Sequence, residues 1–229
     1  IAVGVSLLSV TLALLLTASR GAWMLGVPIG GAIFLSLTWR WRQSADPNTS
    51  QKQRGAWRWL LGAALLIVAA IAVLAITPAW ARVSNSETIW RRFAIWQATL
   101  ELWRAFPLVG VGPGGFFWRY PASLPMNTHL DPNLRHPHNV WLGTISMWGL
   151  LGLGWLVVAL FAVGRAALAT LRDQCAVRQM QWIRIGILAG LAAGLAHGQV
   201  DAFATLTDLA SWHWAALALL ISPANKKGG

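Results

Sequence analysis

The sequence predicts an all-α protein that crosses a membrane as a bundle of about six helices, with one large loop outside the cytoplasm. Hydrophobic residues make up 56% of the chain and charged residues only 11%. Several apolar runs reach about 17–20 residues, which is the length that a helix needs to cross a bilayer. Many of the 16 tryptophans stand beside the ends of these runs, as expected at a membrane interface. Together these features predict a polytopic helical bundle.

Residues 1–77 are expected to hold three membrane helices. The apolar runs that predict them are residues 1–18, 23–39 and 59–77. In the loop at residues 40–58, basic residues outnumber the single acid, Asp46. Because loops rich in lysine and arginine stay inside, we expect this loop to be cytoplasmic.

Residues 139–229 are expected to hold the remaining membrane helices and a basic cytoplasmic tail. Residues 139–171 predict a short helix that breaks near Gly149 and continues as a full span. A basic loop at residues 172–184 follows. Two further spans are predicted at residues 185–204 and 211–221. All the segments predicted to be inside are basic, so the topology agrees with the positive-inside rule.

Residues 78–138 form the predicted extracytoplasmic loop, which begins with a helix. Ser84 and Glu87 make an S-x-x-E capping box, which starts a helix, and Pro107 ends it. Apolar side chains at steps of three and four predict one packed stripe along this helix. The stripe consists of Ile89, Phe93, Trp96, Leu100 and Trp103.

Arginines give this loop a basic character. They are Arg82, Arg91, Arg92, Arg104, Arg119 and Arg135, against three acids. Arg91 has Glu87 four residues before it and is expected to pair with it. Arg92 lies at the edge of the predicted stripe with no acid three or four residues away, and its guanidinium could bind a phosphate bidentately. The alternatives for Arg92 are that it stacks on a tryptophan or extends toward the membrane surface. The alternative for the basic loop as a whole is that it binds anionic lipid headgroups.

A glycine-rich stretch follows the helix, at residues 110–115. It formally matches the G-x-G-x-x-G fingerprint of dinucleotide sites, but no β-α-β unit surrounds it and Pro113 lies inside it. We therefore expect a turn in which Gly112 and Gly114 let the backbone approach the membrane or a ligand closely.

The tetrapeptide at residues 136–139 opens the returning helix, and His138 or Asn139 is expected to cap it. Histidine exchanges protons near neutral pH, so His136 or His138 suits a general base that acts on a hydroxyl. A structural pair and a zinc site completed by His129 and Asp131 are the alternatives, although no H-E-x-x-H motif or cysteine ligand supports zinc.

His197 and Asp201 are four residues apart, which would place them on one face of the fifth predicted span, near its outer end. Ionisable residues in a span usually face the protein interior and often mark a functional site. They could orient the loop or contact a substrate. A hydrogen bond in helix packing is the simpler alternative.

The remaining composition excludes several classes of protein. The single cysteine, Cys175, excludes an internal disulfide framework and a cysteine-based metal cluster. The formal charge of +11 indicates that the basic residues contact anionic lipid headgroups rather than nucleic acid, because no nucleic-acid-binding motif accompanies the charge. The chain begins at Ile1 without a basic n-region, so we expect it to be the C-terminal half of a larger membrane protein.

The order of short motifs in residues 80–170 resembles the O-antigen ligase and O-antigen polymerase family of bacterial membrane glycosyltransferases. The motifs are Arg92–Trp96, Pro107–Phe116, Tyr120-Pro121, His136–Asn139 and Gly149–Gly152. The resemblance implies part of a GT-C-like fold with a large periplasmic loop. In the family pattern, the arginine that holds the diphosphate corresponds to Arg92. The proposed base corresponds best to His138, with His136 as the second candidate.

This resemblance implies a metal-independent, inverting transfer of a glycan from undecaprenyl diphosphate to lipid A core or another glycan or protein acceptor. The expected location is the periplasmic face of the bacterial inner membrane, with membrane lipids as further partners and no cofactor or nucleic acid. We place Arg91 and Arg135 beside Arg92 as candidate diphosphate ligands. The candidate supporting residues are Asn139, Gly112, Gly114, His197 and Asp201. A polymerase or a transporter of bicarbonate or another solute remains the alternative. Transport would favour ionisable groups at the membrane midplane, whereas this chain concentrates them in the loop.

Overall fold

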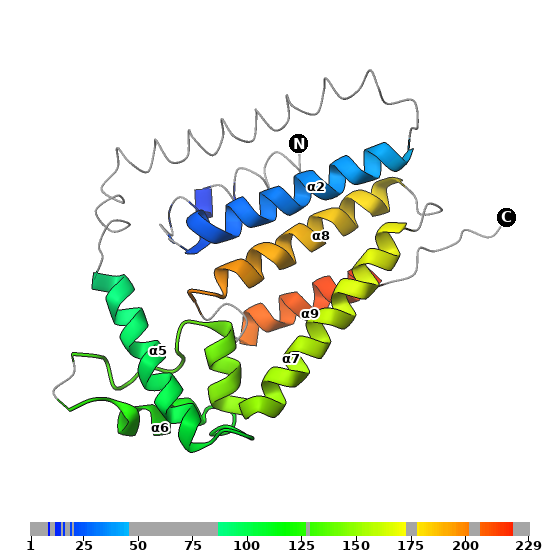
Figure 1. Ribbon diagram of the computed structural model, residues 1–229. Coiled ribbons are helices and arrows are strands. Elements are labelled where there is room, and N and C mark those ends of the chain that lie inside the picture. Colours follow the sequence, from blue (N-terminus) through cyan, green and yellow to red (C-terminus); the bar gives the residue numbers. More distant parts are fainter. Residues whose placement is uncertain are drawn as a thin grey trace.

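The computed structural model describes residues 21–45, 87–126, 129–172, 178–201 and 207–221, together with a few isolated residues between positions 9 and 19. Within these ranges every regular element is helical, which confirms the predicted all-α class (Figure 1). The elements are η1 (Ala22–Gly26, a π-helical turn), α2 (Val27–Ala45), α5 (Glu87–Ala105), α6 (Gly115–Arg119), η3 (Tyr120–Ser123), α7 (Val140–Arg172), α8 (Arg178–His197) and α9 (Thr207–Ile221).

Some predicted elements lie outside the described residues. They are the spans at residues 1–18 and 59–77, most of the basic loop at residues 40–58, and Ser84 of the capping box. The domain boundaries and the count of six spans stay predictions.

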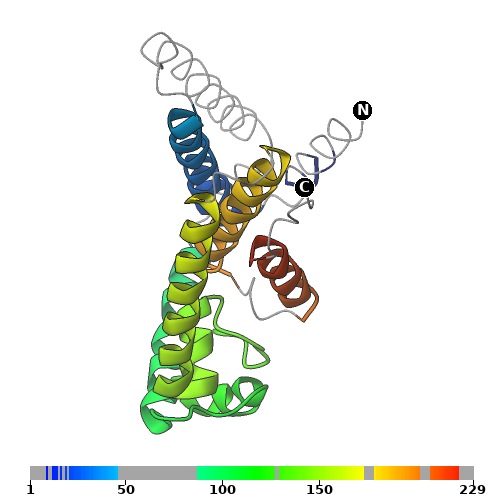
Figure 2. The same cartoon turned by 90° about the vertical axis from the view of Figure 1, so that its right-hand side faces the viewer.

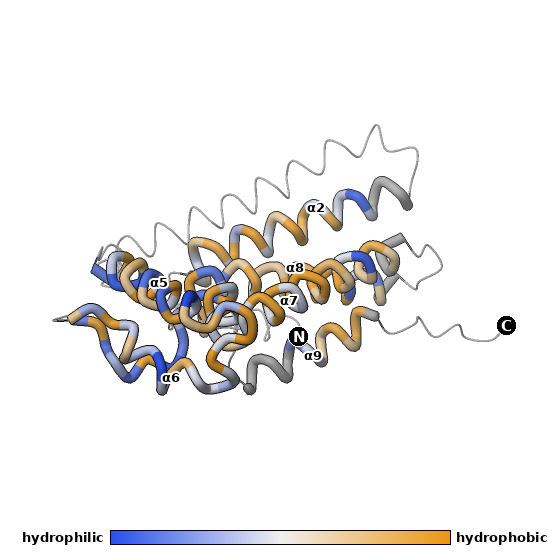
Figure 3. The backbone as a smooth tube through the Cα atoms, turned by 60° about the horizontal axis from the view of Figure 1, so that its bottom comes forward, coloured by the Kyte–Doolittle hydropathy of each residue, from blue (hydrophilic) through white to orange (hydrophobic). Residues whose placement is uncertain are grey.

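Helices α2, α7, α8 and α9 lie alongside one another, and α5, α6 and η3 gather at one end of them (Figures 1 and 2). We call this end, with residues 87–139, the loop end. Helices α2, α7 and α9 begin near it and α8 ends there. The long helices are mostly apolar, whereas α5 and α6 mix polar and apolar positions (Figure 3).

Two helical stretches in the described part of the chain are long and apolar enough to cross a membrane, Ala22–Trp41 and Val140–Ala169. They agree with the spans predicted at residues 23–39 and 139–171. Helix α8 differs from its prediction, because it begins at Arg178 inside the predicted cytoplasmic loop and ends at His197. Residues 178–184 contain no glycine or proline, so nothing stops the helix from starting early, and Gly198 follows its last residue.

Helix α2 packs on α8 through small residues. A Cβ atom added at Gly30 would lie 2.8 Å from Cβ of Ala193 and 3.1 Å from the carbonyl oxygen of Ala189. Small residues let two helix backbones approach closely, which is a common basis of helix association in membranes. At the other end of this pair, the rings of Trp41 and Trp182 meet edge to face at 5.1 Å.

Helix α5 ends two residues before Pro107, close to the predicted end. Of the predicted packed stripe, Trp96 does pack against the core, but the stripe as a whole is wrong. Ile89 and Phe93 are 51% and 52% exposed. The core side of α5 consists instead of Ile95, Ala98, Thr99 and Leu102. The reason is that Phe116 and Tyr120 from α6 and η3, both fully buried and stacked at 4.9 Å, pack in the core cluster with this side of the helix. The small side chains of Ala98 and Thr99 leave room on this side.

Helix α7 is interrupted at Gly149, as predicted, where φ is +63° and ψ is −160°. Such a break frees backbone groups on both sides of it. Residues 107–112, which we call the insert segment, satisfy four of them. The N–H groups of Val111 and Gly112 donate to the carbonyls of Ser146 and Met147, both at 2.9 Å, and those of Leu150 and Leu151 donate to the carbonyls of Pro107 and Leu108 at 2.9 and 3.2 Å.

Two glycines make this backbone contact possible. A Cβ atom at Gly149 would lie 2.1 Å from the carbonyl oxygen of Leu108, and one at Gly110 would lie 2.4 Å from the carbonyl carbon of Met147. The glycine stretch was predicted to approach the membrane or a ligand; within the described residues its close approach is instead to α7, at Gly110. Gly112 and Gly114 have space around them and serve the turn through positive φ values of 84° and 70°.

Candidate functional site

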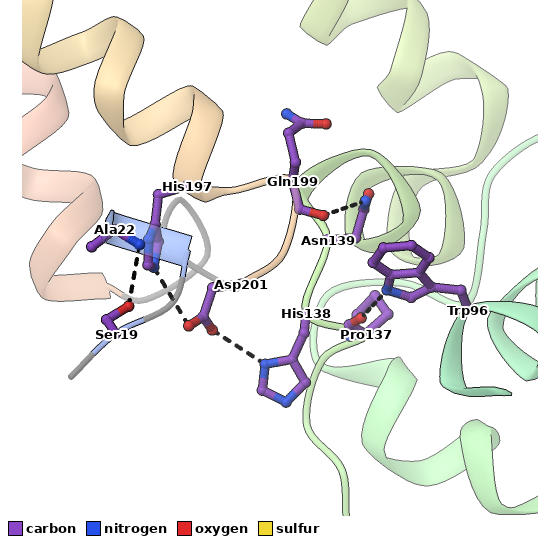
Figure 4. Close-up of polar contacts among 9 residues, drawn as sticks. All are labelled: Ser19, Ala22, Trp96, Pro137, His138, Asn139, His197, Gln199 and Asp201. Atoms are coloured by element: carbon purple, nitrogen blue, oxygen red, sulfur yellow. Dashed lines mark hydrogen bonds and ion pairs between the residues drawn. The ribbon is translucent and has the colours of Figure 1, made fainter. Parts of the chain in front are cut away.

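Four segments meet around His138 at the loop end: α5, residues 136–139, the start of α7 and the turn after α8 (Figure 4). Nε1 of Trp96 on α5 donates a hydrogen bond to the carbonyl of Pro137 at 2.9 Å. The side-chain amide of Asn139 donates to the carbonyl of Gln199 at 2.9 Å. His138 therefore lies between two residues that are each fixed to a different element.

Asn139 caps α7, in agreement with one of the two predicted choices. Its Oδ1 accepts hydrogen bonds from the backbone N–H groups of Trp141 and Leu142 at 2.9 and 3.0 Å. The N–H of Val140 donates to the carbonyl of Gly198 at 2.7 Å. The start of α7 and the end of α8 are thus joined by backbone and side-chain hydrogen bonds.

His138 has a left-handed backbone conformation, with φ of +52°, and within the described residues no other non-glycine residue has a positive φ. This conformation costs about 1–2 kcal/mol, so the neighbouring hydrogen bonds at Pro137 and Asn139 must hold it. It directs the imidazole toward Asp201, with Nδ1 3.2 Å from Oδ1 of that carboxylate (Figure 4). Strained residues of this kind cluster at functional sites.

Asp201 lies between two histidines. Its Oδ2 is 3.4 Å from Nε2 of His197, and its Oδ1 faces His138. The prediction that His197 and Asp201 share a helix face is wrong, because α8 ends at His197 and residues 198–200 form a turn. Gly198 ends the helix, and the turn then brings the carboxylate to His138.

His136 packs against His138 with ring centroids 4.5 Å apart, edge to face. Its Nδ1 is buried and has no hydrogen-bond partner within the part of the chain that the structure covers. Burial, and next the neighbouring His138, lower the pKa of His136, and Asp201 and a backbone hydrogen bond oppose this shift only in part. His136 is therefore held neutral at pH 7.

The candidate anion-binding arginines differ in their surroundings. Arg91 pairs with Glu87 at 2.7 Å, which confirms the predicted ion pair. Arg92 is half-buried and lies one helical turn before Trp96. Arg135 is exposed and directly precedes His136. Arg92 is thus close in sequence to Trp96, which holds Pro137, and Arg135 is close in sequence to Pro137 and Asn139, the neighbours of His138.

The alternative of a zinc site with His129 and Asp131 receives no support. In the ranges given above, no three histidine, cysteine, aspartate or glutamate side chains are grouped so that they could hold a metal ion. The structure instead gives one imidazole, His138, with a carboxylate beside Nδ1 and its second ring nitrogen turned away from that carboxylate (Figure 4). An imidazole oriented in this way can accept a proton at Nε2.

Two residues of this site were not predicted from the sequence. Trp96 was placed in a packed stripe, yet its Nε1 holds Pro137. Gln199 accepts a hydrogen bond from Nε1 of Trp141 at 2.7 Å through Oε1, besides receiving Asn139 at its carbonyl. The signal for Gln199 was its position between the helix-ending Gly198 and the acid Asp201.

A family model described as O-antigen ligase matches residues 4–158, which is more than half of the chain. The match contains Arg92, His138 and the break at Gly149. The turn that carries Asp201 lies beyond it. No curated protein matches the chain.

Proposed function

Because the chain belongs to the O-antigen ligase family, we propose that it moves a glycan from undecaprenyl diphosphate to an acceptor hydroxyl, with His138 as the general base. The family supports the broader statement that the protein is a membrane glycosyltransferase of the O-antigen ligase or polymerase type. The observation that carries the finer proposal is the pairing of His138 with Asp201.

The position of the carboxylate supports a distinct role for each ring nitrogen. With Nδ1–H donating to Asp201, Nε2 of His138 carries the free lone pair and takes the proton of the acceptor hydroxyl. The carboxylate also stabilises the imidazolium that forms. The His138 side chain is 32% exposed, so an acceptor can reach it.

The acceptor oxygen attacks the anomeric carbon as its proton leaves. The bond between that carbon and the diphosphate oxygen breaks, and its electron pair goes to the departing diphosphate. A single displacement of this kind inverts the anomeric configuration. Arg92 and Arg135 would stabilise the negative charge that develops on the diphosphate, which is an electrostatic contribution. Arg91 is the weaker candidate, because Glu87 already matches its charge.

The broad class of substrate follows from the family: a lipid-linked glycan as donor, and lipid A core or a related glycan as acceptor. We place the reaction on the periplasmic face of the inner membrane, because the basic loop at residues 40–58 is predicted to be cytoplasmic and the loop end follows one span later.

The test uses the full-length protein in detergent or nanodiscs with EDTA, a synthetic undecaprenyl-diphosphate glycan and lipid A core acceptor. Transfer is followed by gel for wild type, Arg92→Ala and His138→Ala. General-base catalysis contributes about 10²–10⁴-fold, so His138→Ala should lose at least that much while retaining wild-type helicity. Transfer by His138→Ala at the wild-type rate would overturn the role of the base. Loss of wild-type transfer in EDTA would overturn the metal-independent mechanism.

A further inference from the structure

Helix α5 carries a stripe of aromatic side chains, exposed at its outer end, that the proposed mechanism does not use. The stripe consists of Trp90, Phe93 and Trp96. Trp90 is 70% and Phe93 is 52% exposed. Their ring centroids are 6.1 Å apart, and those of Phe93 and Trp96 are 5.3 Å apart. The three rings therefore follow one another along the helix, from the exposed Trp90 and Phe93 to the partly buried Trp96.

The outer end of the stripe opens into a hollow of about 550 Å³. Its lining residues are Glu87, Trp90, Arg91, Ala94, His129 and Leu130. The hollow thus combines an exposed indole face with a carboxylate, a guanidinium and an imidazole. The hollow is shallow and open to solvent, so it suits one part of an extended ligand rather than an enclosed small molecule.

The balanced charges in the hollow favour a neutral ligand over an anionic one. Glu87 and Arg91 form an ion pair at 2.7 Å, so their charges cancel. An anionic ligand would have to displace Glu87 from Arg91. A neutral, hydroxyl-rich ligand can instead bind both members of the pair, because the carboxylate accepts and the guanidinium donates hydrogen bonds in fixed geometry.

The inner end of the stripe reaches the reaction centre. Nε1 of Trp96 is bound to the carbonyl of Pro137, the residue before His138. Trp90 and Trp96 are six residues apart, which corresponds to about 9 Å along a helix. The stripe thus joins the hollow to the proposed base over a distance that one or two pyranose rings would fill.

We propose that the Trp90–Phe93–Trp96 stripe and the hollow beside it form a subsite for uncharged sugar residues of the glycan. This inference rests on the proposed function. The indole face of Trp90 packs against the C–H face of a pyranose ring, since the negative face of an aromatic ring attracts polarised C–H groups. Glu87 and Arg91 bind the hydroxyl groups at the edge of the ring.

The test measures binding of soluble oligosaccharides without a lipid or diphosphate. The full-length protein in nanodiscs is titrated with neutral tetrasaccharides of glucose, galactose and N-acetylglucosamine, by saturation-transfer NMR. We expect saturable binding of at least one of them, weakened at least about tenfold in Trp90→Ala. Trp118→Ala is the matched control, because Trp118 is 78% exposed on α6 and does not line the hollow. It should bind like wild type.

A second variant tests the neutral character of the subsite. Glu87→Gln leaves the charge of Arg91 unmatched, so binding of an acidic tetrasaccharide of glucuronic acid should rise relative to the neutral one. An unchanged preference in this variant would overturn the assignment of the ion pair.

The outcomes separate this inference from the proposed function. No saturable binding by wild type, or equal binding by Trp90→Ala, would overturn the subsite. Trp90→Ala could instead bind sugar as well as wild type and lose more thermal stability in lipid than in detergent. That result would assign Trp90 to the membrane interface. Oligosaccharide binding that depends on Trp90, without transfer from any undecaprenyl-diphosphate donor, would keep the subsite and reject the glycosyltransferase.

Discussion

Nδ1 of His138 lies 3.2 Å from Oδ1 of Asp201, a residue 63 positions later in the chain. The two side chains come from opposite sides of a junction, one before α7 and the other after α8. The junction is held by the hydrogen bonds from Asn139 to Gln199 and from Val140 to Gly198. The orientation of the proposed base therefore depends on how the end of α8 is joined to the start of α7.

Replacement of Asp201 should impair transfer more than folding. In Asp201→Asn the side chain keeps its size but loses its charge, and its amide can donate to Nδ1 and so favour the wrong tautomer of His138. We expect glycan transfer to fall at least about tenfold, with helicity and melting temperature close to wild type. His197→Gln, which alters the second partner of Asp201 but not His138, is the control and should lose less. Equal losses in the two variants would argue against a specific role for the carboxylate.

Asn139 has two structural roles that substitutions can separate. Asn139→Ala removes both the cap of α7 and the hydrogen bond to Gln199 and should lower stability by about 1–2 kcal/mol. Asn139→Asp keeps the oxygen that accepts from Trp141 and Leu142 but loses the donor to Gln199, so it should retain the cap. Thermal unfolding followed by circular dichroism measures both. A melting temperature of Asn139→Asp as low as that of Asn139→Ala would show that the cap contributes little.

The break in α7 predicts a large difference between two glycines of the same helix. At Gly149 the φ and ψ values are accessible essentially to glycine alone, and a Cβ atom would overlap the carbonyl of Leu108. Gly149→Ala should therefore lose more than about 2 kcal/mol of stability. Gly154→Ala has open space around the new methyl group and should be neutral or more stable by up to about 1 kcal/mol. Similar melting temperatures for the two variants would contradict the packing of the insert segment.

Tyr120 offers a titration that needs no substitution, because it is the one tyrosine in the sequence. Burial, with a smaller contribution from Asp131, raises the pKa of Tyr120 to about 12. The folded protein thus keeps the hydroxyl protonated while the unfolded chain ionises near pH 10. Stability should accordingly fall as pH rises from about 10 to 12.

The absorbance of tyrosinate measures this pKa while circular dichroism monitors helicity at each pH. A midpoint near pH 12, or ionisation that coincides with loss of helicity, agrees with a buried ring. Ionisation complete near pH 10 with full helicity would place the hydroxyl in solvent and contradict the packing of Tyr120 in the loop end.

Local patterns predicted several features of this protein well. Helix α5 ended just before Pro107, Glu87 paired with Arg91, Asn139 capped α7 and Gly149 interrupted it. Each depends on residues within a few positions of one another, so spacing alone carries the information.

Features that depend on distant residues were not predicted. The packed face of α5 was assigned wrongly because large aromatic side chains dominate a periodicity count, whereas the small Ala98 packs in the cluster with the stacked rings of Phe116 and Tyr120. The approach of Asp201 to His138 was missed for a similar reason. It depends on the turn that starts at Gly198, and helical spacing suggested only its pairing with His197.

The position of the break at Gly149 also has a consequence for how deep α7 lies in the membrane. From Leu150 to Ala169, α7 is long enough for about 30 Å of helix, which equals the thickness of the hydrocarbon layer. If this stretch is the part that crosses the bilayer, we expect the interruption at the boundary of the hydrocarbon layer, where water can reach the backbone groups that the insert segment leaves open. Residues 140–148 raise His138 by at most about 14 Å above the boundary. A lipid headgroup can reach that height while its lipid tail stays in the bilayer. The position of Gly149 would therefore determine how far the His138 imidazole lies from the bilayer.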